Sequence, residues 1–125
     1  MKDGFIKAAA ATPRIQVADC VSNTREIIEK AKDAAIAAGE LPEAAEALKD
    51  VEGLIFIGLP LVFGGKLYNT AAVLNRGNIL GIVPKIHLPN YGEFYEARHF
   101  TSGRGVEGSV KIGDQEVAFG SNLLF

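Results

Sequence analysis

Lys85 is the residue of this sequence whose position most directly suggests chemistry. It follows the apolar run 79–83 and Pro84, and it precedes a long stretch without apolar periodicity. This order places its ammonium at the carboxyl end of a strand, the edge at which layered α/β domains bind ligands. A lysine there can stabilise negative charge that develops on a reacting oxygen. For such a residue we expect substantial burial at the strand end, facing a pocket that Tyr91 and Phe94 help to line. A surface lysine that extends to water fits the same spacing, so position alone leaves both interpretations open.

Several titratable side chains follow Lys85 in the segment 87–108. Glu96 precedes His99 by three residues, a spacing used in di-metal carboxylate bundles, and His87 is the other histidine. One such pair without partner helices favours surface or hydrogen-bonded histidines, so no metal site is predicted. Glu93 and Glu96 could form an acid/base pair, as in glycoside hydrolysis, but two glutamates three apart are also common on a solvated turn.

The remaining chemical motifs have simpler structural interpretations. Residues 103–108 match the dinucleotide-binding glycine pattern, but they leave a loop and enter a predicted strand instead of opening a helix, which indicates a turn. Residues 64–66 resemble part of a phosphate loop, but Leu67 replaces the required Ser or Thr, which indicates a hairpin turn. Cys20, the single cysteine, precedes a predicted helix with no base nearby in sequence, and we interpret it as a small core residue.

Periodicity and turn residues predict the elements that must position these side chains. Helices are expected over 23–39, where Asn23 and Glu26 have capping-box spacing, and over 40–51. Strands are expected at 5–11, 54–59, 67–74 and 79–83, with a last hairpin over 109–119. The segment 54–59 is apolar throughout, which is typical of a strand covered on both faces. This order predicts an α/β domain with a mixed sheet, two helices on one face, and strands 5–11 and 54–59 as neighbours or near-neighbours.

Composition limits the classes of function. The 125 residues are 48% hydrophobic and 22% charged, which predicts one globular domain over 1–125. A net charge of -2 argues against nucleic acid or an anionic membrane as partner. The longest apolar run, 54–63, is too short to span a bilayer, and no secretory leader is recognisable. A single cysteine fits a reducing compartment, so we expect a soluble, cytoplasmic protein.

Several segments carry a resemblance to a known family. They are GLPL at 58–61, GKLYNTAAVL at 65–74 and RGNILGIVPK at 76–85. Together they resemble the middle of a nitrilase-superfamily amidase domain. The run LPNYGEFYEAR at 88–98 narrows the resemblance to the glutaminase domains of glutamine-dependent NAD synthetases, and AAATPRIQVAD at 9–19 agrees with it.

This resemblance implies a partial αββα sandwich and a cysteine, lysine and glutamate triad that hydrolyses glutamine. In the family the cysteine attacks the side-chain amide, the glutamate shuttles protons and the lysine helps to hold the oxyanion. Lys85 falls on that lysine, Tyr91 falls on a tyrosine of the glutamine pocket, and Phe94 and Glu96 fall in the same active-site loop. The ammonia passes to a synthetase domain, absent from this chain, that uses ATP and magnesium. No cofactor is expected in this segment itself.

The chain also departs from the family pattern. The family's second strand, which ends in Phe-Pro-Glu, should follow Gly39, but the sequence continues directly into the predicted helix 40–51. Glu43 in that helix is interpreted as a helix-start residue, with the catalytic glutamate as the less favoured alternative. The family's cysteine lies beyond the position of Phe125, and Cys20 falls on no catalytic position.

These departures predict a fragment or an internally deleted form of such a domain that is inactive alone. The edge strands left by a missing element would favour a homo-oligomer. A non-catalytic nitrilase-like scaffold or oligomerisation module is the alternative interpretation. A stand-alone amidase with another substrate agrees less well with the sequence at 91–95.

Overall fold

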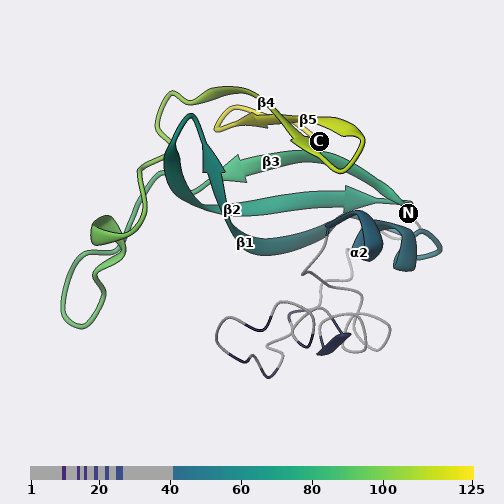
Figure 1. Ribbon diagram of the computed structural model, residues 1–125, viewed down its shortest axis with the longest axis horizontal. Coiled ribbons are helices and arrows are strands. Elements are labelled where there is room, and N and C mark those ends of the chain that lie inside the picture. The colour runs from purple at the N-terminus through teal and green to yellow at the C-terminus, as the bar shows by residue number, and fades with distance from the viewer. Residues whose placement is uncertain are drawn as a thin grey trace, which may run out of the picture.

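The computed structural model describes residues 41–125 and, before them, only Ala10, Arg14, Gln16, Asp19, Ser22, Arg25 and Glu26. The elements are α2 (Leu41–Ala47), β1 (Ile55–Phe63), β2 (Lys66–Asn75), β3 (Asn78–Pro84), the 3-10 helix η1 (Glu96–Arg98), β4 (Glu107–Ile112) and β5 (Gln115–Gly120) (Figure 1). Each strand predicted after residue 41 is present. The predicted strand 5–11 lies outside the described residues except for Ala10, and the predicted helix 23–39 does so except for Arg25 and Glu26, which are helical. The pairing of 5–11 with 54–59 is likewise not described.

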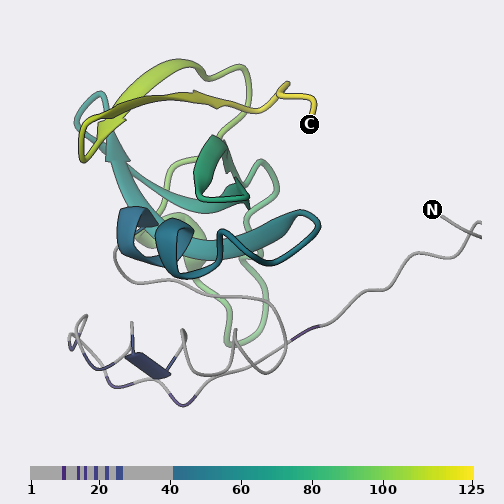
Figure 2. The same cartoon turned by 90° about the vertical axis from the view of Figure 1, so that its right-hand side faces the viewer.

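The strands form one five-stranded sheet in the order β1-β2-β3-β5-β4. All neighbouring pairs are antiparallel except β3 and β5, which run parallel with Ile82 opposite Phe119. The sheet is therefore mixed, as predicted, and the long segment between β3 and β4 supplies the connection that a parallel pair needs. Figure 2 shows that the strands twist strongly relative to one another, with α2 beside one part of the sheet.

Tight turns join the antiparallel strands of the first two hairpins. Arg76 and Gly77, with φ angles of 44° and 82°, connect β2 to β3. Gly64 and Gly65, with φ angles of 55° and 74°, connect β1 to β2. Two-residue turns with positive φ at both positions match the twist of the flanking strands, and the predicted hairpins are confirmed. In the second hairpin the register shifts by one residue between Val73 and Leu74.

β1 differs from the strand predicted at 54–59 in length and in burial. It continues through Pro60, because an edge strand tolerates a residue without an N–H on its outer side. Its side chains alternate, with Ile57 buried, whereas Phe56 is 54% and Val62 is 61% exposed. The prediction that this strand is covered on both faces is therefore wrong for the part of the chain that the structure describes.

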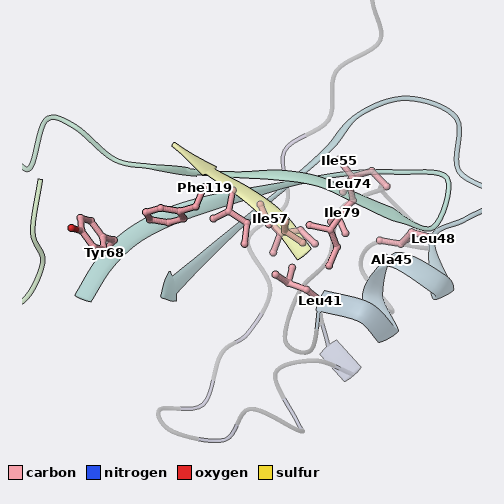
Figure 3. Packing of buried hydrophobic residues seen from close by; sticks show 12 residues of the cluster. Leu41, Ala45, Leu48, Ile55, Ile57, Tyr68, Leu74, Ile79 and Phe119 are labelled. Atoms are coloured by element: carbon pink, nitrogen blue, oxygen red, sulfur yellow. The ribbon is translucent and has the colours of Figure 1, made fainter. Parts of the chain in front are cut away.

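α2 closes one end of the hydrophobic core. Leu41, Ala45 and Leu48 recur at a spacing of three and four residues, and their side chains point toward Ile57 and Ile79 of the sheet (Figure 3). The predicted second helix is confirmed, with shorter bounds than 40–51. Within the described part of the chain, no helix has the length and apolar character that a bilayer crossing requires.

Aromatic side chains fill another part of the core. Phe119, only 1% exposed, stacks on Phe63 with ring centroids 4.6 Å apart and meets the edge of Tyr68 at 5.5 Å. β5 pairs with β3 at Ile82 and Phe119 alone, so these ring contacts help to hold the β4–β5 hairpin on the sheet.

The segment between β3 and β4 leaves the sheet as a long loop that projects from one end of it (Figure 1). Its two ends are hydrogen-bonded to each other. The N–H of Gly103 donates to the carbonyl of Lys85 at 3.0 Å, and Oγ of Ser102 donates to the carbonyl of Ile86 at 2.7 Å. The loop therefore starts and ends at a fixed neck beside the last residue of β3.

Gly103 permits the close approach of the two chain segments at this neck. A Cβ at this position would lie 2.5 Å from Cβ of Pro84 and 2.8 Å from its carbonyl oxygen. The glycine pattern at 103–108 thus runs from the neck into β4, as predicted, and no helix follows it. It lacks the helix N-terminus on which dinucleotide-binding glycines depend.

Candidate functional site

Lys85 lies directly after β3, where the long loop leaves the sheet. Its N–H donates to the carbonyl of Asn69 at 2.8 Å, which continues the contact between β2 and β3 beyond the strand end. Its Nζ lies 2.9 Å from Oε1 of Glu96, and 39% of its side chain is exposed. The prediction that Lys85 is substantially buried is therefore wrong, because the loop projects outward and Glu96 returns to the strand end.

Glu96 is positioned by η1, which it opens. Its N–H donates to the carbonyl of Pro89 at 3.2 Å, and its own carbonyl accepts the N–H of Phe100 at 2.8 Å. The side chain is 23% exposed, with Oε1 facing Lys85 and Oε2 lying 3.5 Å from Nδ2 of Asn69. Each carboxylate oxygen has a partner, so the side chain is held in one orientation between the loop and the sheet.

Asn69 is a residue of this site that sequence reasoning missed. The register of the second hairpin places Thr70 opposite Pro84 and therefore Asn69 next to Lys85. The turn at Arg76 and Gly77 does not fix this register by itself, because it shifts by one residue between Val73 and Leu74. A regular hairpin built from the sequence would have placed Asn69 opposite Pro84, one residue away from Lys85.

The predicted glutamine-pocket residues Tyr91 and Phe94 lie on the same loop. Their ring centroids are 5.8 Å apart in an edge-to-face arrangement, and the N–H of Phe94 donates to the carbonyl of Tyr91 at 3.0 Å. Tyr91 is 71% and Phe94 is 46% exposed. In the described part of the chain no hydrogen bond joins this ring pair to Lys85 or Glu96, so the structure shows two separate pairs within residues 85–96.

The other candidates from the sequence stay apart from this site. Glu93 is exposed and has no ion pair within residues 41–125, so the structure brings Glu96 to Lys85 and not to Glu93. Among the described residues, no group of three or more His, Cys, Asp or Glu side chains could hold a metal ion. Cys20 and the side chain of Glu43 lie outside the described residues, and so do any contacts that they make.

Shifted pKa values occur away from the site. The backbone N–H of Ser22 donates to Asp19 at 2.9 Å and lowers the pKa of that carboxyl group. A hydrogen bond with Glu46 raises the pKa of Lys49. In the candidate site itself, the ion pair of Lys85 and Glu96 sets one positive charge against one negative charge.

This geometry can bind and orient a negative oxygen. An ammonium has three donors, and Glu96 uses one of those on Lys85, which leaves donors for a ligand at the strand end. The described part of the chain contains no cysteine. It thus presents a charge stabiliser without a thiol nucleophile.

Comparison with known proteins relates the whole chain to one family. No protein-family model matches the chain. The glutamine-dependent NAD(+) synthetase of Mycobacterium tuberculosis is 32% identical over 152 residues, covering 98% of this chain and 22% of the relative. That of Thermotoga maritima is 52% identical over 50 residues, covering 40% of this chain and 8% of the relative. The chain is homologous to the N-terminal part of the glutamine-dependent NAD(+) synthetases.

Solved structures of these synthetases have a matching fold. The enzyme from Cytophaga hutchinsonii superposes with a TM-score of 0.62 at 25% identity, covering 90% of this chain and 24% of that one. The Acinetobacter baumannii enzyme, solved with adenosine diphosphate, gives a TM-score of 0.55 at 25% identity, covering 88% of this chain and 26% of that one. The predicted nitrilase-like α/β class is confirmed.

The chain spans about a fifth of the length of these synthetases, since it covers 22% of the Mycobacterium relative. The aligned stretch of 152 positions is longer than the 125 residues of the chain, so at least 27 positions, 152 less 125, have no counterpart here. This difference agrees with the internal segment that the resemblance indicates as missing.

Proposed function

We propose that this chain contributes the lysine half of a glutamine-hydrolysing site and that, by itself, it binds glutamine without hydrolysing it. The observation that carries the proposal is the ion pair of Lys85 and Glu96 at the carboxyl end of β3, on the motif residues that resemble the family's active-site lysine and loop. The homology to glutamine-dependent NAD(+) synthetases supports glutamine as the ligand.

In the proposed reaction a thiolate attacks the side-chain amide carbon of glutamine. The carbonyl π electrons move to oxygen, and the ammonium of Lys85 stabilises the resulting oxyanion. The glutamate of the family's triad gives the nitrogen the proton that it took from the thiol, and collapse of the intermediate then breaks the carbon–nitrogen bond and releases ammonia. Water then hydrolyses the thioester to glutamate and regenerates the thiol. Glu96 acts here as a positioning residue, because its contact is with Lys85 and Asn69.

Tyr91 and Phe94 are proposed to bind the aliphatic part of glutamine. Their rings are exposed on the loop that starts at Lys85, and they lie edge to face. Aromatic side chains provide apolar area at small entropic cost, which suits the two methylene groups of this ligand. Ordering of these rings over the ligand would also exclude water from the strand end.

The remaining chemistry is proposed for a separate synthetase domain. Most of each relative's length lies outside the part that this chain covers, and one related structure holds adenosine diphosphate. We propose that ATP and magnesium are bound there, for amidation of deamido-NAD, and that no cofactor binds to this segment.

We expect the isolated chain to lack catalytic activity because it has no thiol at a catalytic position. Cys20 is the single cysteine in the sequence, and the resemblance gives it no catalytic position. Oxyanion stabilisation without a nucleophile leaves binding and little catalysis. The alternative function, a non-catalytic scaffold or oligomerisation module, is favoured by the outer edge of β1, with which no strand of residues 41–125 pairs. This alternative predicts no glutamine binding at all.

The test combines an activity assay with a binding assay on the purified chain. We expect no ammonia release from glutamine, and we expect glutamine to shift the amide resonances of residues 85–96 in an NMR titration. Lys85→Ala should abolish these shifts, whereas Lys111→Ala, on the exposed face of β4, should leave them unchanged. Glutamate formation that is lost in Cys20→Ser would show that the nucleophile has been misassigned. No binding by the wild-type chain would favour the scaffold function.

A further inference from the structure

We propose that Leu80 is a positioning residue for Lys85, because the β-bulge that it forms in β3 turns the lysine away from the core and toward the candidate site. The register of β2 and β3 pairs Ile79 and Gly81 with consecutive residues of β2, which leaves Leu80 without a partner in that strand. Two residues of one strand then oppose a single residue of the other, which is the arrangement of a β-bulge.

The bulge decides from which face of the sheet Lys85 projects. Ile79 and Lys85 are six residues apart, an even number, and successive side chains of a strand alternate between its two faces. An unbroken β3 would therefore direct both side chains to the core, which Ile79 faces (Figure 3). Continued without a shift, the pairing of Leu74 with Ile79 would also bring Lys85 opposite Tyr68, a core residue that is only 4% exposed. A buried ammonium without a carboxylate partner is strongly destabilising.

After the bulge the side chains of β3 take the opposite faces. Ile82, which is 0% exposed, and Pro84 are buried. Lys85 continues the pairing on the other face, because its N–H donates to the carbonyl of Asn69 at 2.8 Å. The side chains of Lys85 and Asn69 both reach the carboxylate of Glu96. One extra residue thus lets β3 contribute to the core at both ends and still direct its terminal lysine outward.

The segment that follows β5 fixes the bulge at Leu80. A Cβ on Gly81 would lie 2.9 Å from Cδ1 of Leu123 and 3.0 Å from Cε1 of Phe125, so a side chain at this position would displace both. If Gly81 were the extra residue, Leu80 would take its place opposite Val73 and meet the same two side chains. The glycine therefore occupies the paired position, and the leucine is left as the extra residue.

The consequence for glutamine rests on the proposed function, whereas the consequence for the lysine does not. A slip of one residue exchanges the faces of all the side chains in a strand. If β3 slipped beyond the bulge, Lys85 would lose Glu96 and Ile82 would leave the core. A negative oxygen at the strand end would then meet no ammonium. The residue count of β3 therefore couples burial of the core to orientation of the lysine.

The experiment compares two one-residue deletions in β3 of the full chain by NMR. Deletion of Leu80 removes the residue without a partner, so the pairs on either side of it can join without a shift. We expect the nuclear Overhauser effects (NOEs) between Asn69 and Lys85 to persist. Those between Ile82 and Phe119, which are opposite in the wild type, should also persist. The Kd for glutamine, from the same kind of titration, should stay within about twofold of the wild-type value.

Deletion of Val83 is the matched control, because it removes a paired apolar residue from the same strand. If the bulge remains, Lys85 comes opposite Thr70 on the core face, and its NOEs to residue 69 are lost. If the bulge closes instead, Ile82 turns away from Phe119. One of the two sets of NOEs must therefore disappear, and loss of the lysine set should raise the Kd for glutamine at least about tenfold.

Three results would overturn the proposal. A Leu80 deletion that unfolds, or that loses the NOEs between Asn69 and Lys85, would show that the face of the lysine does not depend on this bulge. A Val83 deletion that keeps both sets of NOEs would show the same, and if that variant does not fold, the Leu80 deletion decides. A Leu80 deletion that keeps the NOEs but binds glutamine at least about tenfold more weakly would indicate that Leu80 contacts the ligand itself. Wild-type chain that binds no glutamine contradicts the proposed function, and the NOEs still decide the positioning role.

Discussion

Lys85 and Glu96 meet across eleven residues of sequence, with Nζ and Oε1 2.9 Å apart. The lysine is fixed to β2 by its backbone, and the glutamate is fixed by η1, so the ion pair joins the sheet to the projecting loop. The pair is partly exposed, and such pairs stabilise a fold by about 1 kcal/mol at most. Its main effect is therefore to orient the ammonium at the strand end.

Removal of the charge on Glu96 should loosen the loop with little effect on the fold. In Glu96→Gln we expect a loss of about 0.2 to 1 kcal/mol in the free energy of unfolding, because one partly exposed ion pair is lost. Amides 86–100 should exchange with solvent faster than in the wild type, as measured by hydrogen-exchange mass spectrometry. Glu93→Gln removes an equal charge from an exposed turn and should change neither quantity. Equal protection of the loop in both variants would contradict the positioning role of Glu96.

Gly103→Ala should disturb the neck of the loop. The new Cβ would lie 2.5 Å from Cβ of Pro84, a distance that requires the backbone to move. We expect a loss of about 1 to 3 kcal/mol in urea unfolding. Gly58→Ala, where no atom lies within 4 Å of the added carbon, is the matched control and should not destabilise the monomer. Wild-type stability of Gly103→Ala would mean that the neck is open in solution.

The fold was predictable where local signals were strong. The turns at Gly64 and Gly65 and at Arg76 and Gly77 lie between apolar runs, and both hairpins formed as predicted. Burial of β1 was not predictable, because its apolar residues on both faces indicate a neighbour or a covering layer that residues 41–125 do not supply. Strand composition reports where a strand could be buried, whereas actual burial depends on what packs against it.

The candidate site was predictable only where it depends on a local signal, as the fold was. The position of Lys85 follows from the end of a recognisable strand. The role of Glu96 as its partner depends on how a loop without periodicity folds, and the exposure of Lys85 depends on where that loop points. Asn69 enters the site through the register of the second hairpin, which the turn alone does not give, because the register shifts by one residue between Val73 and Leu74.

Phe119→Ala should be the most destabilising of the substitutions considered for the monomer. The ring is 1% exposed and packs against Phe63 and Tyr68, so its removal leaves a cavity at the contact that holds β5 on β3. We expect a loss of about 3 to 5 kcal/mol in urea unfolding. Phe94→Ala, at a ring that is 46% exposed on the loop, should lose less than about 1 kcal/mol. Equal losses in the two variants would contradict the core assignment.

Thr70→Val tests the side-chain hydrogen bond that joins β2 to β1. Thr70 is 3% exposed, and its hydroxyl donates to the carbonyl of Leu59 at 2.7 Å. Valine keeps nearly the same shape without the donor, so we expect a loss of about 0.5 to 1.5 kcal/mol in urea unfolding. Thr101→Val is the control, because the hydroxyl of Thr101 makes no hydrogen bond within the described residues, and it should remain near wild-type stability. If Thr70→Val is as stable as the wild type, this side-chain hydrogen bond contributes nothing net to the fold, and the backbone pairs of β1 and β2 hold the hairpin without it.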